Sequence, residues 1–247
     1  MRKRCSALID GDLLIDLGPD LMAAAMQHGI ALHSLRYCLQ THHHSDHLDP
    51  HHFESRSAYC GVYGTPRLAY YAGMVAIEHA SAILGRPAPI GTSADAEADR
   101  KMNLDVIPVA IGQTFAVGPY QVNSVPAAHC EGAMLYIVER DGRRLFYATD
   151  TGPLGETAWA QLATLAPIDV LVLDHTFGFK KRSSGHLNAE QFQETVAQMR
   201  DIGLVRPDTR VIAHHLGHHS HPIHEETEAY AAQRGYGVAY DGMQVEI

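Results

Sequence analysis

The sequence has 247 residues, of which 46% are hydrophobic and 19% charged, and its formal net charge is −9. This length suffices for a well-buried core, and the composition is that of an ordinary globular protein. The acidic balance excludes an overall basic field that would collect nucleic acid, although bound metal ions would reverse the sign locally. The 18 histidines are the exception in this composition, and they suggest metal binding.

The cysteines and the N-terminus indicate the compartment. The four cysteines include no C-x-x-C pair, which argues against a disulfide framework and a cysteine zinc site and fits a reducing cytosol. The basic N-terminus is followed by too few apolar residues for a signal peptide, and no apolar run approaches the length of a membrane span. We therefore expect a cytoplasmic protein that does not bind a membrane.

The first predicted elements are a hairpin and a helix. Two short apolar runs flank Asp10-Gly11, which is a strong hairpin signal. Residues 21–35 form a modestly amphipathic segment that predicts a helix. An apolar segment over residues 32–39 then predicts a strand, or a short helix leading into the end of a strand.

A dense group of metal-ligand side chains follows that segment. Four histidines and an aspartate occupy residues 42–47, and neutral imidazole and carboxylate suit Zn²⁺, Mn²⁺ and Fe²⁺. His42 and His44 project to one side of an extended chain, whereas Asp46 and His47 follow round a turn and can face a second ion. The alternative, a solvated histidine-rich loop or a tag, is disfavoured because the run is internal and interrupted.

The next stretch is less informative. The sequence predicts a turn or short helix at 51–53, a strand at 59–63 stopped by 64–66, a helix over 67–84 and a loop over 91–101.

Three short runs at 105–110, 114–117 and 120–126, separated by glycines, predict a β-meander that ends just before His129. A second hairpin, 133–139 with 144–149, ends just before Asp150. A histidine after a strand is often structural, and Asp150 could equally cap a helix that begins near residue 154.

The last third predicts alternating strands and helices. The elements are a strand at 168–174, a basic loop at 177–184, a helix from Asn188 to about 200, a strand at 211–213, a helix at 225–234 and a closing strand and turn at 238–247. The strand at 211–213 leads to His214 and His215. No repeat or linker divides the chain, so we predict one domain, 1–247.

The pattern His42-x-His44-x-Asp46-His47 resembles the signature of metallo-β-lactamase fold hydrolases. Periodicity alone predicts only a mixture of α and β structure, whereas the resemblance implies a four-layer αββα sandwich. It also implies two ions: His42, His44 and His129 hold one, Asp46, His47 and His215 hold the other, and Asp150 bridges them. His214 competes with His215 for its role, and the resemblance assigns Asp16 to support the metal loop, although Asp16 could simply form a turn.

The closest likeness within that family is to the PhnP-like branch, the phosphoribosyl cyclic phosphodiesterases. The two carboxylates and the Gly185-His186-Leu187 motif carry this likeness, which implies that His186 contacts phosphate and protonates the leaving alkoxide. The branch's extra cysteine zinc site is absent, and so is the family's usual first strand. The resemblance also places a lid or substrate wall at 67–103.

We therefore expect a hydrolase with two divalent metal ions, Zn or Mn, that acts on a small, open or cyclic phosphodiester. A pair of ions about 3.5–4 Å apart provides a bridging hydroxide as nucleophile, and the expected catalytic residues are Asp46, Asp150 and His186. The alternatives are a nuclease acting on DNA or RNA ends, a lactone or thioester hydrolase, and a non-catalytic metal-binding protein. Nucleic acid is the less favoured substrate, and the sequence leaves a homodimer open.

Overall fold

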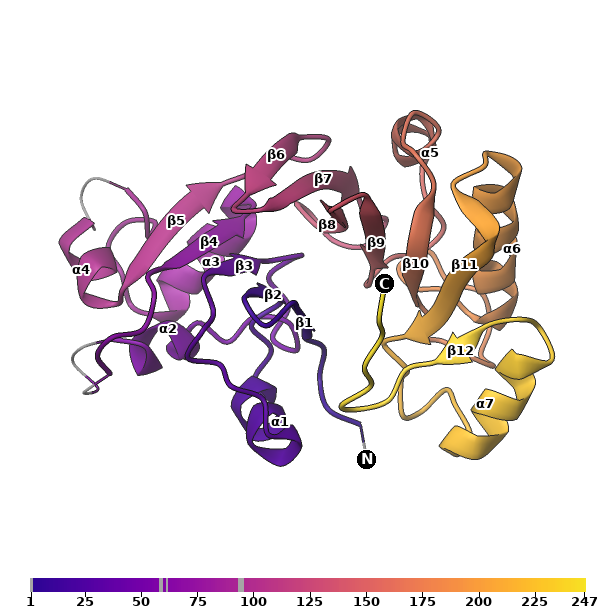
Figure 1. The fold of residues 1–247 in the computed structure, drawn as a ribbon, viewed down its shortest axis with the longest axis horizontal. Coiled ribbons are helices and arrows are strands. Elements are labelled where there is room, and N and C mark those ends of the chain that lie inside the picture. Colours follow the sequence, from indigo (N-terminus) through magenta and orange to yellow (C-terminus); the bar gives the residue numbers. More distant parts are fainter. Residues whose placement is uncertain (1, 58–59, 61, 93–95) are drawn as a thin grey trace. The chain divides into compact units, whose positions relative to one another are not determined.

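The structure, a computed structural model, describes residues 2–57, 60, 62–92 and 96–247. It divides into two compact units, one of residues 3–110 and one of Arg2 with residues 111–247. Each unit is built on its own β-sheet (Figure 1). That both units form one domain, 1–247, stays a prediction. No helix among the described residues is long and apolar enough to cross a membrane.

The first unit contains a five-stranded sheet whose spatial order follows the sequence. Its strands are β1 (Ala7–Ile9), β2 (Leu13–Ile15), β3 (Tyr37–Leu39), β4 (Leu68–Ala72) and β5 (Leu104–Pro108). β1 and β2 pair antiparallel, and Asp10 and Gly11 between them take φ angles of 48° and 77°. Two left-handed residues are what a tight hairpin turn requires, so the predicted hairpin is confirmed. The other neighbours in this sheet pair in parallel.

The helices of this unit are α1 (Leu21–His28), α2 (His51–Ser55), α3 (Met74–Ile83) and α4 (Ala96–Lys101). The α1 helix is shorter than the predicted 21–35, because Gly29 adopts the left-handed conformation with φ 65° and ends it. The loop predicted over 91–101 is partly wrong, since α4 occupies its end. The predicted short helix at 51–53 is confirmed.

The helix predicted over 67–84 is wrong in its first part. Leu68, Tyr70 and Ala72 are buried while the residues between them are half-buried, which is the period-two pattern of a strand. This strand, β4, lies between β3 and β5, and the helix begins only at Met74. The stretch 67–103, expected to form a lid, therefore contributes a strand to the sheet.

The strand predicted at 59–63 falls partly outside the described residues, which omit 58, 59 and 61. Of the described residues in that stretch, Val62 and Tyr63 do not belong to a strand.

The second unit contains a seven-stranded sheet in the order β12-β11-β10-β9-β8-β7-β6. Its strands are β6 (Thr114–Val117), β7 (Tyr120–Pro126), β8 (Met134–Arg140), β9 (Arg143–Ala148), β10 (Ile168–Asp174), β11 (Val205–His214) and β12 (Gly237–Val238). Strands β6 to β9 pair antiparallel, and β9 to β12 pair in parallel. The meander is thus β6-β7-β8, because β5, which was expected to open it, pairs in the other sheet.

The helices of the second unit are α5 (Glu156–Leu162), α6 (Ala189–Asp201) and α7 (His224–Ala232). As predicted, Asn188 caps α6: its side chain accepts a hydrogen bond from the Gln191 amide, and the Gln191 side-chain oxygen accepts one from the Asn188 amide. The N-cap of α5 is Gly155. Asp150 therefore does not cap α5, which removes the structural alternative for that residue.

The register of the parallel strands gathers polar residues at one edge of the second sheet. Ala148 of β9 pairs with Leu173 of β10, and Asp174 of β10 pairs with His214 of β11. Because the carboxyl ends of parallel strands meet at one edge, the residues that follow them lie close together.

A chain of hydrogen bonds between uncharged groups lies inside the second unit. The Tyr236 hydroxyl donates to His175 Nε2 (3.3 Å), His175 Nδ1 donates to His221 Nε2 (2.8 Å), and His221 Nδ1 donates to the Gly217 carbonyl (3.0 Å). His175 is fully buried. Burial and the neighbouring His221 lower the pKa of His175 to about 3, and burial raises the pKa of Tyr236 to about 12. This arrangement therefore requires an uncharged His175.

The pKa of His175 predicts a stability that falls with acid. Unfolded histidine binds a proton near pH 6.5, whereas folded His175 resists it down to about pH 3. The contribution of neutral His175 to the free energy of unfolding is thus fully present above pH 6.5. Below that pH, the free energy of unfolding should fall by up to about 1.4 kcal/mol per pH unit. Urea unfolding with chelator present, compared between wild type and His175→Gln, measures this. The stability difference between the two should shrink between pH 7.5 and 5.5, and parallel curves would contradict the prediction.

Candidate metal centre

In the first unit, Asp16 organises the histidine loop. Asp16 follows β2, is fully buried, and has a left-handed φ of 65°. Its carboxylate accepts hydrogen bonds from the Thr41 amide (2.8 Å), the Thr41 hydroxyl (2.8 Å), the Gln40 side-chain amide (3.0 Å) and His47 Nδ1 (2.7 Å). A buried carboxylate needs such donors to offset its lost hydration. The supporting role expected of Asp16 is thus present.

These hydrogen bonds fix which nitrogen each histidine can offer. Because the Thr41 hydroxyl donates to Asp16, its oxygen accepts from His42 Nδ1 at 3.0 Å. His47 Nδ1 donates to Asp16 directly. Both imidazoles therefore carry the proton on Nδ1 and keep Nε2 as the ligand nitrogen.

The predicted ligands of this unit lie close together. The His42 ring centroid is 4.6 Å from that of His44 and 4.4 Å from that of His47, and His47 Nε2 lies 3.6 Å from an Asp46 carboxylate oxygen. Gln40 holds the loop closed, because its amide nitrogen also lies within hydrogen-bond distance of the carbonyls of His42 and His47.

In the second unit, three predicted residues surround Asp150, which is buried beyond the end of β9. His129 Nε2 lies 3.5 Å from one carboxylate oxygen of Asp150, and His215 Nδ1 lies 2.9 Å from the other. His186 Nδ1 is 3.9 Å from Asp150. His129 Nδ1 donates to the Gly185 carbonyl (3.0 Å), so its Nε2 is again the nitrogen that faces the carboxylate.

Asp174 plays in this unit the part that Asp16 plays in the other. It is fully buried at the end of β10 and accepts from His186 Nδ1 (3.0 Å), the Thr176 hydroxyl (2.9 Å) and amide (3.0 Å), and the Leu187 amide (3.0 Å). The Thr176 oxygen in turn accepts from His215 Nδ1 at 2.7 Å. Each buried aspartate thus holds one histidine directly and a second through a threonine.

The geometry favours His215 over His214 beside Asp150. His214 ends β11 and places Nδ1 3.1 Å from the Thr149 hydroxyl. His215 follows with a left-handed φ of 55°, which turns the chain out of the strand, and its ring stacks on that of His186 at 5.8 Å and 11°.

His186 is placed by Asp174 and does not cap a helix, since Asn188 is the N-cap of α6. Burial alone would lower the pKa of His186, but its hydrogen bond to Asp174 and the charges of Asp174 and Asp150 outweigh burial, so the pKa of His186 is raised. Because His186 Nδ1 donates a hydrogen bond to Asp174, Nε2 is the nitrogen available to a substrate.

The donor chemistry of the second unit, considered alone, fits a divalent cation. In the second unit, ligand atoms of Asp150, Asp174, His186 and His215 all lie within 4.8 Å of one another. Zn²⁺ and Mn²⁺ are usually bound by carboxylate oxygens and by imidazole nitrogens. In such an imidazole, the other ring nitrogen donates a hydrogen bond to a neighbouring group.

Gly152 brings the Asp150 turn against the basic loop. A Cβ on Gly152 would lie 1.9 Å from the Ser184 carbonyl oxygen, so only glycine allows this approach. The Gly152 amide also donates to the Ala128 carbonyl (2.8 Å), next to His129.

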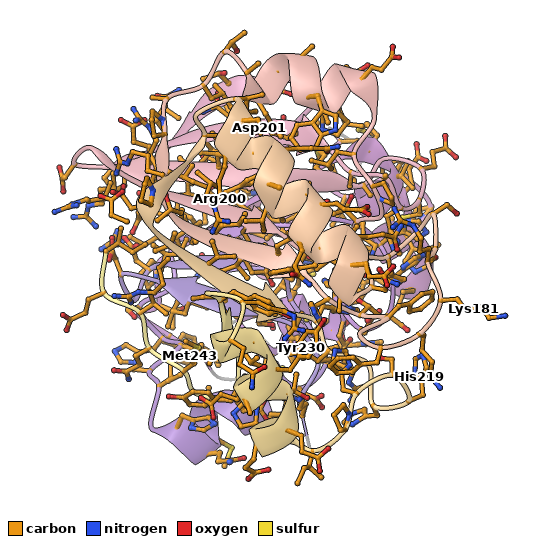
Figure 2. The ribbon with its side chains drawn as sticks, turned by 90° about the vertical axis from the view of Figure 1, so that its right-hand side faces the viewer. Lys181, Arg200, Asp201, His219, Tyr230 and Met243 are labelled. Carbon is orange, nitrogen blue, oxygen red and sulfur yellow. The ribbon has the colours of Figure 1, made fainter. Side chains whose placement is uncertain are left out.

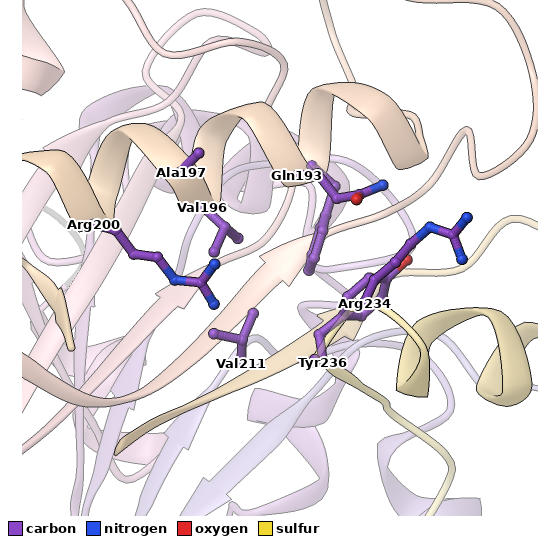
Figure 3. A pocket seen from close by; sticks show the side chains of 9 residues that line it. Gln193, Val196, Ala197, Arg200, Val211, Arg234 and Tyr236 are labelled. Carbon is purple, nitrogen blue, oxygen red and sulfur yellow. The ribbon is translucent and has the colours of Figure 1, made fainter. Parts of the chain in front are cut away.

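A separate hollow of about 280 Å³ lies between α6 and β11 and contains none of these ligands. Figure 3 shows Arg200 and Arg234 on opposite sides of it, with Val196 and Val211 between them.

Comparison with known proteins identifies the family. A model described as the β-lactamase superfamily domain matches residues 12–216. The chain belongs to that superfamily. A comparison with curated protein sequences finds no significant match.

Solved structures similar to this chain show that it has the metallo-β-lactamase fold. A diphosphatase from the PhnP family is 20% identical with a TM-score of 0.71, covering 100% of this chain and 84% of its own. The metallo-β-lactamase fold protein YhfI from Bacillus subtilis is 17% identical with a TM-score of 0.69, covering 99% and 92%. Human tRNase Z, short form, is 14% identical with a TM-score of 0.64, covering 100% and 92%. These likenesses confirm the predicted fold class, and the match over residues 12–216 confirms the predicted superfamily.

Four residues of the site were missed from the sequence, namely Gln40, Thr41, Asp174 and Thr176. Thr41 directly precedes the first ligand, and Asp174 and Thr176 follow a buried strand. A polar residue at the end of a buried strand was therefore the available signal. Gln40 carried the same signal, because it directly follows the strand β3.

The support given by Asp16 predicts a loss of metal affinity on substitution. In Asp16→Asn the amide NH₂ would face groups that donate hydrogen bonds, so His42 and His47 would lose their fixed orientation. We expect divalent-metal affinity to fall by about 10–100-fold, measured by competition with a chromophoric chelator. Asp10→Asn, in an exposed turn, is the matched control. Unchanged affinity in Asp16→Asn would remove its supporting role.

Proposed function

We propose that this metal-dependent hydrolase cleaves small phosphodiesters and uses two divalent ions, zinc or manganese. The observation that carries the proposal is the His186–Asp174 pair beside Asp150. A histidine held by a buried carboxylate is suited to contact a phosphate and to give a proton to a leaving oxygen.

The proposed ligands come from both units. His42, His44 and His129 would hold one ion, Asp46, His47 and His215 the other, and Asp150 would serve both. The hydrogen bonds of the histidines support this set of ligands. Where Nδ1 of a histidine donates to a threonine, an aspartate or a carbonyl, Nε2 is left to bind an ion. When bound, such a pair of ions supplies a nucleophile at neutral pH and stabilises charge on the leaving oxygen.

His186 has a role distinct from that of the ligands. Its Nδ1 donates to Asp174, which fixes the ring plane and favours the protonated imidazole that a general acid needs. As the reaction proceeds, Nε2 would contact a phosphate oxygen and transfer its proton to the departing alkoxide. Asp174 stabilises the charge of the imidazolium before this transfer and still accepts the Nδ1 hydrogen bond of the neutral ring after it.

The net charge of −9 supports a small substrate over a nucleic acid, because a polyanion is repelled beyond the reach of the ions. Tight oligonucleotide binding with a steep dependence on salt would instead favour a nuclease. Hydrolysis of lactones or thioesters in preference to phosphodiesters would favour that alternative, and metal binding without any turnover would indicate a non-catalytic protein. The homodimer and the cytoplasmic location stay predictions.

The proposal predicts about two divalent ions per chain and their dependence on Asp150. Asp150→Ala should lose metal and activity together, because one carboxylate serves both ions. Elemental analysis of protein purified without added metal measures the content. Asp201→Ala, at the exposed end of α6 (Figure 2), is the control and should keep both. A full metal complement in Asp150→Ala would contradict the bridging role.

The test of the function is His186→Ala assayed on two phosphodiesters. With an alkyl leaving group, kcat should fall by about 10²–10⁴-fold, the usual worth of a positioned proton donor. With a nitrophenolate leaving group, which needs no proton, the loss should be much smaller. Metal content should stay at the wild-type level, and exposed His28→Ala is the control. An equal loss on both esters, or no hydrolysis of either by the wild type, would overturn the assignment.

A further inference from the structure

The hollow between α6 and β11 lies within the second unit and has no part in the chemistry described above. Its volume is about 280 Å³, and its described lining includes none of the proposed metal ligands. A cavity of about 150 Å³ is large enough for benzene. The hollow therefore has room for a small organic molecule of one or two rings.

The buried part of this lining is apolar or aromatic. Phe192, Val196, Val211 and Tyr236 line the hollow, and all four are buried. The rings of Phe192 and Tyr236 lie 4.6 Å apart, and they pack on the imidazole of His175 at 5.0 Å and 5.9 Å. The Tyr236 hydroxyl is also hydrogen-bonded to His175. Because these contacts fix both rings, the hollow offers an aromatic molecule a preformed apolar surface.

The charged residues of the described lining are both arginines. Arg200 belongs to α6, and Arg234 lies between α7 and β12. Figure 3 shows the Arg200 side chain extending from α6 toward Val211, with Arg234 on the opposite side of the hollow. Among the residues that the structure describes, neither arginine forms an ion pair with a carboxylate. The positive charge of this lining, in a chain whose net charge is −9, favours an anion.

The two arginines are not equivalent. The guanidinium carbon of Arg234 lies 3.5 Å from the centre of the Tyr230 ring, and Arg234 Nη1 donates to the Tyr230 carbonyl (3.0 Å), so Arg234 is held by its own neighbour. Arg200 is exposed in the last turn of α6, where the helix dipole also favours a cation. The dipole accounts for the charge of Arg200 but not for its direction toward Val211. Its planar guanidinium can donate two parallel hydrogen bonds to one carboxylate.

We propose that this hollow is a second ligand site, which binds a small aromatic carboxylate. The rings of the ligand lie against Phe192 and Tyr236, and Arg200 binds its carboxylate. A phosphate dianion fits less well, because it would lose more hydration beside the apolar side chains. The described lining offers no group that activates water, so the occupant is bound and not converted. This inference does not depend on the proposed function.

The first test compares three probes by isothermal titration calorimetry. 2-Naphthoate carries the rings and the charge, 2-naphthamide carries the rings alone, and inorganic phosphate carries charge alone. We expect 2-naphthoate to bind about 10-fold more tightly than 2-naphthamide, which is the worth of a charge-assisted hydrogen-bonded pair. Phosphate should show no binding that depends on Arg200. Equal affinity for 2-naphthoate and 2-naphthamide, no binding of 2-naphthoate, or binding of phosphate that depends on Arg200 overturns the inference.

Two variants locate the bound probe. Arg200→Gln should weaken 2-naphthoate about 10-fold and leave 2-naphthamide unchanged. Ala197→Leu, at an exposed position of α6 that lines the hollow, fills the space without changing the charge and should weaken both probes. Glutamine and leucine suit a helix, so both variants should fold, which thermal unfolding checks. Wild-type affinity for 2-naphthoate in either folded variant overturns the inference.

Arg210→Gln is the matched control. Arg210 is exposed on β11 and precedes Val211, so its side chain lies on the opposite face of the strand from the hollow. This variant loses the same charge as Arg200→Gln and should bind 2-naphthoate as the wild type does. An equal loss of affinity in both arginine variants would show a general effect of net charge and would overturn the role of Arg200.

A carboxylate can also bind a metal ion, so the titration is repeated after the metal is removed with a chelator. Because the hollow lies apart from the proposed ligands, the affinity for 2-naphthoate and the effect of Arg200→Gln should both be retained. Loss of binding with the metal would assign the probe to the metal centre and overturn this inference. Neither outcome bears on the proposed function, which the His186→Ala assays test separately.

Discussion

Two fully buried carboxylates determine how this protein arranges its histidines. Asp16 and Asp174 each lie at the end of a β-strand with no exposed surface, and a buried charge of this kind must be surrounded by hydrogen-bond donors. In both units the donors are one histidine, bound directly, and one threonine that relays to a second histidine. The need to satisfy the carboxylate and the need to orient the ligands are therefore met by the same contacts.

In each unit, this arrangement orders the histidines by contacts within that unit. The histidines do not need an ion to choose their tautomer, because their Nδ1 protons are already committed to oxygen. A site prepared in this way loses little conformational freedom when an ion binds, which favours affinity. The residues that hold the histidines, namely Asp16, Thr41, Asp174 and Thr176, are all buried.

The parts of the structure that could be predicted are those encoded locally. The ligand run at 42–47, the turn at Asp10-Gly11 and the capping box at Asn188 depend on neighbours in the sequence. The parts that could not be predicted depend on distant partners. Gln40 bonds to Asp16, 24 residues before it, and the role of Asp174 depends on the return of His186 to it. The apolar residues of β4 suit a helix and a strand alike, and only the pairing with β3 and β5 decides between them.

The loop between β10 and α6 is attached through Asn188, Gln191 and backbone groups, none of which is a proposed ligand. Its exposed tip, residues 179–182, can therefore vary without disturbing the ions or their supporting aspartates, which makes it a natural unit for recombination between relatives. One constraint travels with it: the chain at Ser184 must still pass over a residue without a side chain at position 152. A library that randomises the tip and keeps Gly152 would explore new substrates at little risk to folding.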